Sequence, residues 1–321
     1  MRNLNIIGNG FDLHHNIPTK YADYREWLYI NGSCRTILNC HSQNDDPFWS
    51  DVENGLKIDC NKFVKYYIEA FNFVDVSPGH LIDQNQEVVD KVNALRNTYD
   101  EYTFLTGVEF YNWLYETYYS AISDTKKDDL FYSGDKNFFV NFNYTLTLED
   151  LYNVDKESIL HIHGVLNKEI KDQLISCVVV RDSIMKHRKD ALVRSEIQFG
   201  CIENNPKVVD DIGILKQLKA RNEYFNINTL KNDLKMYLRN SYKNPKRNYS
   251  RLEKFIDSCG EIDQIIIMGN NVFGPDWGYY ENILIPRYKM LRWIVYCYGD
   301  NYDSAYKLRD KYSLNVEIRQ W

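Results

Sequence analysis

The sequence predicts an α/β fold with a mostly parallel sheet flanked by helices. Short apolar runs that are typical of buried strands alternate with helical patterns along much of the chain. Several of these runs also end in Gly, Asn or His, and ligands of open α/β sheets bind outside the carboxyl ends of the strands. Because no repeat, low-complexity tract or clear linker divides the sequence, we expect a single domain over residues 1–321.

The first strand is expected at residues 4–7, and two glycines follow it at once. Gly8 and Gly10 lack a Cβ, so the backbone can turn sharply there and approach a ligand closely. The full dinucleotide fingerprint needs a third glycine, and Leu13 stands at that position. The motif therefore indicates either a nucleotide site or a tight turn from strand to helix without a ligand.

A largely helical insertion or cap is predicted between the first and second strands, over residues 20–125. Apolar spacing of the helical type, interrupted by a polar loop at 41–50, occurs at 21–30, 61–73, 86–102 and 108–122.

The later part of the chain returns to alternating strands and helices. Strands are expected at 137–142, 158–164, 174–180, 263–268, 291–298 and 315–318. Helices are expected at 146–152, 277–288 and 304–312, with two or three more in the basic segment 207–258. Gly260 is the expected C-cap of that segment.

Charge and cysteine content restrict the function classes. The net charge of −6 gives no global nucleic-acid footprint. Residues 216–254, however, hold eleven Lys or Arg against three Asp or Glu, a local charge of +8. Such a run marks either an anionic partner such as RNA, DNA or tRNA, or the solvated side of helices.

Seven cysteines without C-x-x-C pairs indicate a reducing compartment, not a disulfide framework or a zinc site. The sequence shows neither a signal-peptide pattern nor a membrane-spanning window, so we expect a soluble, cytoplasmic protein. No clustered ligand spacing requires a metal, and none is predicted.

Four polar junctions are candidates for one shared site at the carboxyl edge of the sheet. They are 8–12, 141–145, 161–164 and 269–271. His163 suits a general base because imidazole titrates near neutrality, and His161 is its expected packed, hydrogen-bonded neighbour. Asn143 either holds a ribose or a water, or starts a helix.

Two acidic residues near these junctions also have alternative roles. A carboxylate at Asp12 would repel a phosphate, so Asp12 either contacts a hydroxyl, a positive ring or an arginine, or caps the next helix. Asp276 precedes a helical pattern and is expected first as its N-cap.

An ordered set of motifs resembles the AbiH family of bacterial abortive-infection proteins. The set comprises residues 5–13 with Pro18–Tyr21, Phe48–Glu53, Phe142–Thr145 with Leu148 and Glu149, Ile162–Gly164, and 265–280 with Gly269 and Asp276. This resemblance spans nearly the whole chain. It implies a role in phage defence, in which an infected cell halts growth or dies before phage release.

The motif order is also remotely similar to Sir2-type NAD-binding domains. That similarity implies a Rossmann-like (Sir2-like) sheet, with Gly8 and Gly10 as the loop glycines, Asn143 as the NAD-contacting residue, and His163-Gly164 as the base and its glycine. It implies NAD⁺ as a substrate that is hydrolysed. The candidate binding residues are Gly8, Asn9, Gly10, Phe11, Asp12, Thr145, Gly164, Gly269, Asn270 and Asp276.

The sequence departs from the Sir2 pattern at three features. Asp12 replaces a small hydroxyl residue, Thr145 stands where an acid is usual, and the four-cysteine zinc module has no counterpart. The missing zinc module argues against protein deacylation. Because of the differences at Asp12 and Thr145, the substrate could be a nucleotide other than NAD⁺. A nucleic-acid-directed effector that uses 216–254 and a non-catalytic nucleotide sensor are the alternatives. A phage-derived trigger and homo-oligomerisation also stay open.

Overall fold

The computed structural model divides into two compact units, each assembled from separate segments. The first comprises 1–26, 111–198 and 244–321, and the second comprises 27–110 and 199–243. The structure describes residues 1–321 except 33, 41–46, 58, 62–63, 65–99, 102, 132–133, 177–182, 200, 202–203, 213–223 and 299–301. The predicted boundaries at 20–125 and 207–258 stay predictions.

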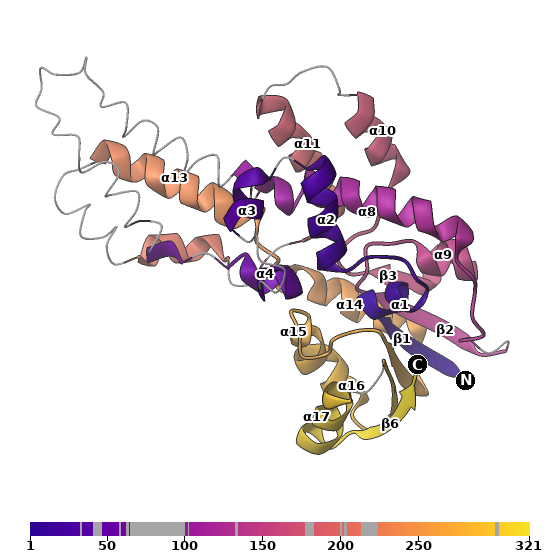
Figure 1. Ribbon diagram of the computed structural model, residues 1–321. Helices are drawn as coiled ribbons and strands as arrows, with labels where there is room; N and C mark the ends of the chain where they lie inside the picture. The colour runs from indigo at the N-terminus through magenta and orange to yellow at the C-terminus, as the bar shows by residue number, and fades with distance from the viewer. Residues whose placement is uncertain are drawn as a thin grey trace, which may run out of the picture. The chain divides into compact units, whose positions relative to one another are not determined.

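The first unit holds a six-stranded sheet in which every pairing is parallel, which confirms the predicted α/β class. The strands are β1 (Arg2–Ile7), β2 (Lys136–Asn141), β3 (Ile159–His161), β4 (Gln264–Met268), β5 (Arg292–Cys297) and β6 (Asn315–Gln320). Their order, β3-β2-β1-β4-β5-β6, is Rossmann-like and places β3 and β6 at opposite edges (Figure 1). The direction of winding reverses between β1 and β4, where α/β proteins of this order form a crevice.

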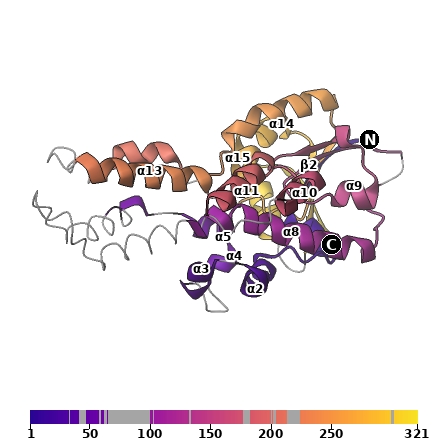
Figure 2. The ribbon, with the colours of Figure 1, turned by 90° about the horizontal axis from the view of Figure 1, so that it is seen from above.

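One face of the sheet is apolar throughout. Alternate residues of the four central strands, including Leu4, Ile6 and Ile267, are buried there, because successive strand residues point to opposite faces. Leu160 of β3 and Val316 and Ile318 of β6 are partly buried against the same cluster. Leu252 and Ile256 of α14 (Lys246–Cys259) pack in the same cluster. Figure 2 shows α14 on one side of the strands and α8 (Val108–Ala121) on the other.

The opposite face carries a smaller apolar cluster. Ile7, Phe139 and Met268 form a second cluster with Phe11 of α1 (Asn9–His14) and Leu148 of α9 (Thr147–Tyr152). This cluster holds the loop after β1 against the sheet and so fixes the polar junctions that follow the strands.

Further helices complete the described residues. In and around the first unit they are α2 (Tyr21–Asn31), α10 (Lys168–Ser176), α11 (Ser183–Glu196), α15 (Trp277–Tyr279), a π-helical turn (Tyr280–Leu284), α16 (Ile285–Tyr288) and α17 (Asp303–Tyr312), with 3₁₀ turns at Ile122–Asp124 and Lys156–Ser158. In the second unit they are α3 (Arg35–Cys40), α4 (Pro47–Ser50), α5 (Val52–Gly55) and α13 (Tyr224–Asn240), with a 3₁₀ turn at Pro206–Asp211.

The second unit contains a buried ion pair. The Lys243 Nζ lies 2.8 Å from Glu53 Oε2, and the Lys243 side chain is 2% exposed. Phe110 ends the first segment of this unit and Phe199 begins the second, and their rings stack with centroids 4.1 Å apart. Buried charges require such pairing because an isolated one is costly to desolvate.

Two sequence expectations are wrong within the described residues. The strand expected at 174–180 begins inside α10, where Ile170 and Leu174 are buried one helical turn apart. The loop expected at 41–50 ends in α4, whose Trp49 is buried. Residues 177–180 and 41–46 lie outside the described residues, as do most of the helices expected at 61–73 and 86–102.

Candidate functional site

The loops after β1 and β4 bond directly to one another at the carboxyl edge of the sheet. The Gly8 N–H donates to the Met268 carbonyl at 3.0 Å, and the Gly10 N–H donates to the Gly269 carbonyl at 2.8 Å. Gly269 has a φ of +67°, which favours glycine because a Cβ is strained there. The two junctions are therefore one continuous structure at the point where the winding reverses.

This contact explains why the first loop needs glycines. A Cβ on Gly8 would lie 2.5 Å from the Asn270 Cα, and a Cβ on Gly10 would lie 2.7 Å from the Gly269 Cα. The glycines were expected to let the backbone approach a ligand. In the structure they let the loop after β1 approach the loop after β4. The Phe11 N–H also bonds within the loop, to the Gly8 carbonyl, so these three N–H groups are already used.

Asn143 joins the loop after β2 to the same structure. Its Nδ2 donates to the Gly8 carbonyl at 3.0 Å, and its backbone N–H donates to Asn141 Oδ1 at 2.9 Å. The residue is 5% exposed. Asn143 thus lies at the predicted edge, and its side chain holds two strand ends together.

Asp12 is buried under α9 with both oxygens bonded. Oδ2 accepts from the Thr145 hydroxyl and Oδ1 from the Thr147 hydroxyl, each at 2.7 Å. Burial raises the pKa of the Asp12 carboxyl from its ordinary 3.8 to about 6, although the threonine hydroxyls act in the opposite direction. The hydroxyls that Asp12 contacts therefore belong to the protein.

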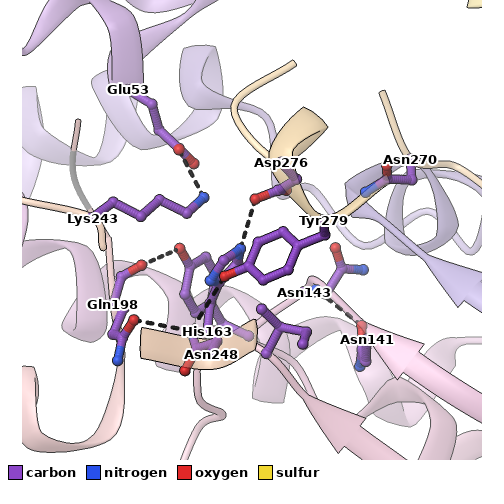
Figure 3. A network of polar contacts seen from close by, with 12 residues as sticks. Glu53, Asn141, Asn143, His163, Gln198, Lys243, Asn248, Asn270, Asp276 and Tyr279 are labelled. Atoms are coloured by element: carbon purple, nitrogen blue, oxygen red, sulfur yellow. Dashed lines mark hydrogen bonds and ion pairs between the residues drawn. The ribbon is translucent and has the colours of Figure 1, made fainter. Parts of the chain in front are cut away.

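His163 and Asp276 form a polar pair (Figure 3). His163 Nε2 lies 2.8 Å from Asp276 Oδ1, across 113 residues of sequence. The His163 side chain is 1% exposed, whereas the Asp276 side chain is 14% exposed. Asp276 is the N-cap residue of α15, as predicted, but makes no capping bond.

The turn that carries His163 is tightly defined. The Gln198 N–H donates to the His163 carbonyl at 2.8 Å. Gly164 follows with a φ of +88°, and a Cβ there would lie 1.6 Å from the Glu196 carbonyl oxygen. The glycine after the histidine is therefore required by packing against the end of α11.

Aromatic rings surround the His163 imidazole. The ring centroids of Phe142, Tyr144 and Tyr279 lie 5.6, 6.2 and 6.0 Å from it. A surrounding of low polarity strengthens the electrostatic interaction between an imidazolium and a carboxylate. The imidazole and the carboxylate therefore interact in a surrounding formed mainly by aromatic rings.

The partly exposed rim of this edge carries amide side chains. Asn9 is exposed, and its side chain exchanges two bonds with Thr19, through the Thr19 carbonyl at 2.9 Å and hydroxyl at 2.7 Å. Asn270 is half-buried, and its Oδ1 accepts from the Tyr280 hydroxyl at 2.7 Å. These bonds hold both amides in fixed orientations at the carboxyl edge of the sheet.

The comparison with protein families decides the identity of the chain. The family model described as bacteriophage abortive infection AbiH matches residues 4–297. The chain belongs to the AbiH family. This membership indicates a role in phage abortive infection and confirms that resemblance. Searches of curated proteins and of solved structures found no significant match, so the similarity to Sir2-type domains gains no support from them.

In this AbiH-family protein the loops after β1, β2 and β4 contact one another, and their residues have different structural roles. Gly8, Gly10, Asn143 and Gly269 build the edge, and Phe11 packs in the core beneath it. The His161 Nε2 lies 2.8 Å from Glu149 Oε1. Because β3 ends at His161, the two histidines reach different carboxylates.

Sequence reasoning missed one residue that shapes the site. Arg251 of α14 donates from Nη2 to the His161 carbonyl at 3.1 Å and from Nη1 to the Ile162 carbonyl at 3.4 Å. It fixes the end of β3 immediately before His163. The only sequence signal for Arg251 was its place in the basic run, which does not indicate a contact with β3.

Across the described parts of the chain, no group of three or more His, Cys, Asp or Glu side chains is placed to hold a metal ion. Among the described helices, none is both long and apolar enough to span a membrane.

Proposed function

We propose that this AbiH-family protein acts in abortive infection by hydrolysing the N-glycosidic bond of NAD⁺ or a related nucleotide. The observation that carries the proposal is the His163–Asp276 pair, whose aspartate is partly exposed in the loop after β4. In sheets of the same strand order, nucleotides bind outside the carboxyl ends of the strands, where the winding reverses between β1 and β4.

The two members of the pair differ in exposure, and we assign them different roles in the reaction. Asp276 is the more exposed group, so it accepts the proton of the attacking water and stabilises the cationic ribosyl centre. The water oxygen bonds to the ribosyl carbon while the carbon–nitrogen bond breaks and its electrons leave with the base. His163 holds the carboxylate in position and receives the proton from it.

The rim supplies groups for substrate hydroxyls. Asn9 and Asn270 present oriented amides, and amides both donate to and accept from hydroxyl groups. The N–H groups of Gly8, Gly10 and Phe11 already donate to protein carbonyls, so we assign no phosphate to them.

The test is turnover of NAD⁺ by the purified protein and in phage-infected cells that express it. Loss of NAD⁺ and release of the base are measured over time for the wild type, Asp276→Asn and His163→Gln. We expect both substitutions to reduce turnover by about 100-fold or more, which is typical of a lost general base. His161→Gln is the matched control, because His161 bonds Glu149 and not Asp276.

Two outcomes would contradict the proposal. If neither NAD⁺ nor another nucleotide is consumed while infected cells still stop growing, the reaction is wrong. If a nucleotide binds without turnover, and Asp276→Asn weakens only the binding, the edge is a sensor.

A nucleic-acid-directed effector is the second candidate, and the exposed Lys246, Arg247 and Lys254 on α14 favour it. Part of the basic run is already paired with acids, however, because Lys243 is buried with Glu53 and Lys235 bonds Asp210 at the surface. Charge reversal of Lys246, Arg247 and Lys254 together should weaken RNA binding and flatten its salt dependence. Unchanged binding would remove this candidate.

A further inference from the structure

The outer side of the edge strand β6 is open for pairing with another strand. β6 bonds β5 on one side, and among the described residues no strand pairs with its other side (Figure 1). Arg292–Cys297 and Asn315–Gln320 pair residue by residue without interruption, so β6 contains no bulge. The strand also contains neither proline nor lysine, which native edge strands use to prevent pairing.

The opposite edge of the sheet is protected in two ways. β3 is short, because it spans only Ile159–His161. In addition, Arg251 donates to the carbonyls of His161 and Ile162 at the end of this strand. Short edge strands with occupied backbone groups offer little to another chain. The two edges therefore differ, and β6 is the one that can extend the sheet.

The direction of the backbone groups of β6 follows from a bond at its end. The Trp321 N–H donates to the Cys297 carbonyl of β5 at 2.9 Å. Because the N–H and C=O groups of successive strand residues point alternately to the two sides, the odd-numbered residues of β6 face β5. The N–H and C=O groups of Val316, Ile318 and Gln320 consequently face away from the sheet.

The charged side chains of β6 favour a second copy of this chain as the partner. Glu317 and Arg319 lie on the same face of the strand, and each side chain is 34% exposed. Within one chain Arg319 Nε donates to Glu317 Oε1 at 2.8 Å, whereas Arg319 Nη2 makes no hydrogen bond among the described residues. When an identical strand is rotated by a half-turn and placed alongside, each of these charges meets its opposite.

We propose that two copies of the chain associate through β6, antiparallel and about a twofold axis at Ile318, so that their sheets become continuous. Ile318 then pairs with itself and Val316 with Gln320, and their outward N–H and C=O groups bond reciprocally. On both sides of the axis Glu317 stands opposite Arg319 of the second copy. An axis at Glu317 or at Arg319 would place like charges opposite one another, which is destabilising. The interface does not depend on the proposed hydrolysis.

Sedimentation velocity of the full-length protein over a range of concentrations tests the proposal. The wild type should reach twice the 38.2 kDa mass of one chain. Glu317→Arg and Arg319→Glu each place like charges opposite one another, so each variant should self-associate about tenfold or more weakly. Glu253→Arg makes the same change of charge on the exposed surface of α14 and should associate as the wild type does.

Mixing the two charge variants separates strand pairing from damage to the fold. In a mixed dimer the introduced arginine meets the introduced glutamate, and the unchanged Arg319 meets the unchanged Glu317. The equimolar mixture should therefore dimerise as tightly as the wild type. The double variant Glu317→Arg/Arg319→Glu should dimerise by itself, and it replaces the mixture if a single variant does not fold. The proposal is overturned if the wild type remains a monomer, if either single variant dimerises like the wild type, or if neither the mixture nor the double variant dimerises.

Discussion

Asp12→Asn should stabilise the protein near neutral pH and remove part of its pH dependence. The Asp12 carboxyl is 1% exposed, and both oxygens accept from threonine hydroxyls. An asparagine keeps the shape and carries no charge. Its Oδ1 can accept from one hydroxyl and its Nδ2 can donate to the other, since a hydroxyl is also an acceptor.

The magnitude follows from the difference between the folded and unfolded pKa. The pKa of Asp12 is about 6 when folded and 3.8 in its ordinary state, so between these values the folded protein binds more protons than the unfolded chain. The contribution of Asp12 to the free energy of unfolding is therefore fully present below pH 3.8 and is lost as the pH rises towards 6. At 1.36 kcal/mol per pH unit, the loss amounts to about 3 kcal/mol.

The assay is urea unfolding of wild type and Asp12→Asn at several pH values from 4 to 7.5. The stability advantage of the variant should grow by up to about 3 kcal/mol across this window and then remain constant. Comparing the two proteins cancels the titration of other groups. A difference that does not change with pH would refute the inference that Asp12 is destabilised in its charged form.

Three other substitutions test the structure of the edge and of the second unit. Gly164→Ala should cost about 3 kcal/mol or more, measured by thermal unfolding, because the position combines a φ of +88° with a clash. Asn143→Ala should cost about 0.5 to 1.5 kcal/mol in denaturant unfolding, through the lost bond to Gly8; an unchanged midpoint would count against that bond. Lys243→Met should cost about 3 to 5 kcal/mol, because it leaves the Glu53 carboxylate buried without its cation, whereas an exposed lysine would cost far less.

The sheet was predictable because its strands are short apolar runs between turn residues. The convergence of the polar junctions was predictable for a related reason: parallel strands place their carboxyl ends at the same edge. The error at 174–180 arose because Leu174 and the following β-branched residues fit a strand locally. Packing decided otherwise, since Ile170 and Leu174 cover the same helical face of α10.

The roles of individual side chains depended on contacts that no local pattern encodes. Asp276 has the sequence context of an N-cap, yet its side chain bonds His163 across 113 residues. The glycines of the first loop indicated a close approach, but the sequence does not say whether a ligand or another loop fills the space. In the same way, Asn5 lies in an apolar run and gives no local sign that its side chain donates to Asn137 on the neighbouring strand.

The position of β1 in the middle of the sheet has a consequence for biosynthesis. This first strand pairs with β2, and on its other side with β4, where Asn3 bonds Gln264 across 261 residues. Contacts of such long sequence separation form slowly and cannot form before both partners leave the ribosome. The carboxyl edge and the His163–Asp276 pair are therefore assembled only after residue 276 has emerged, so that most of the nascent chain is made before the protein acquires this edge.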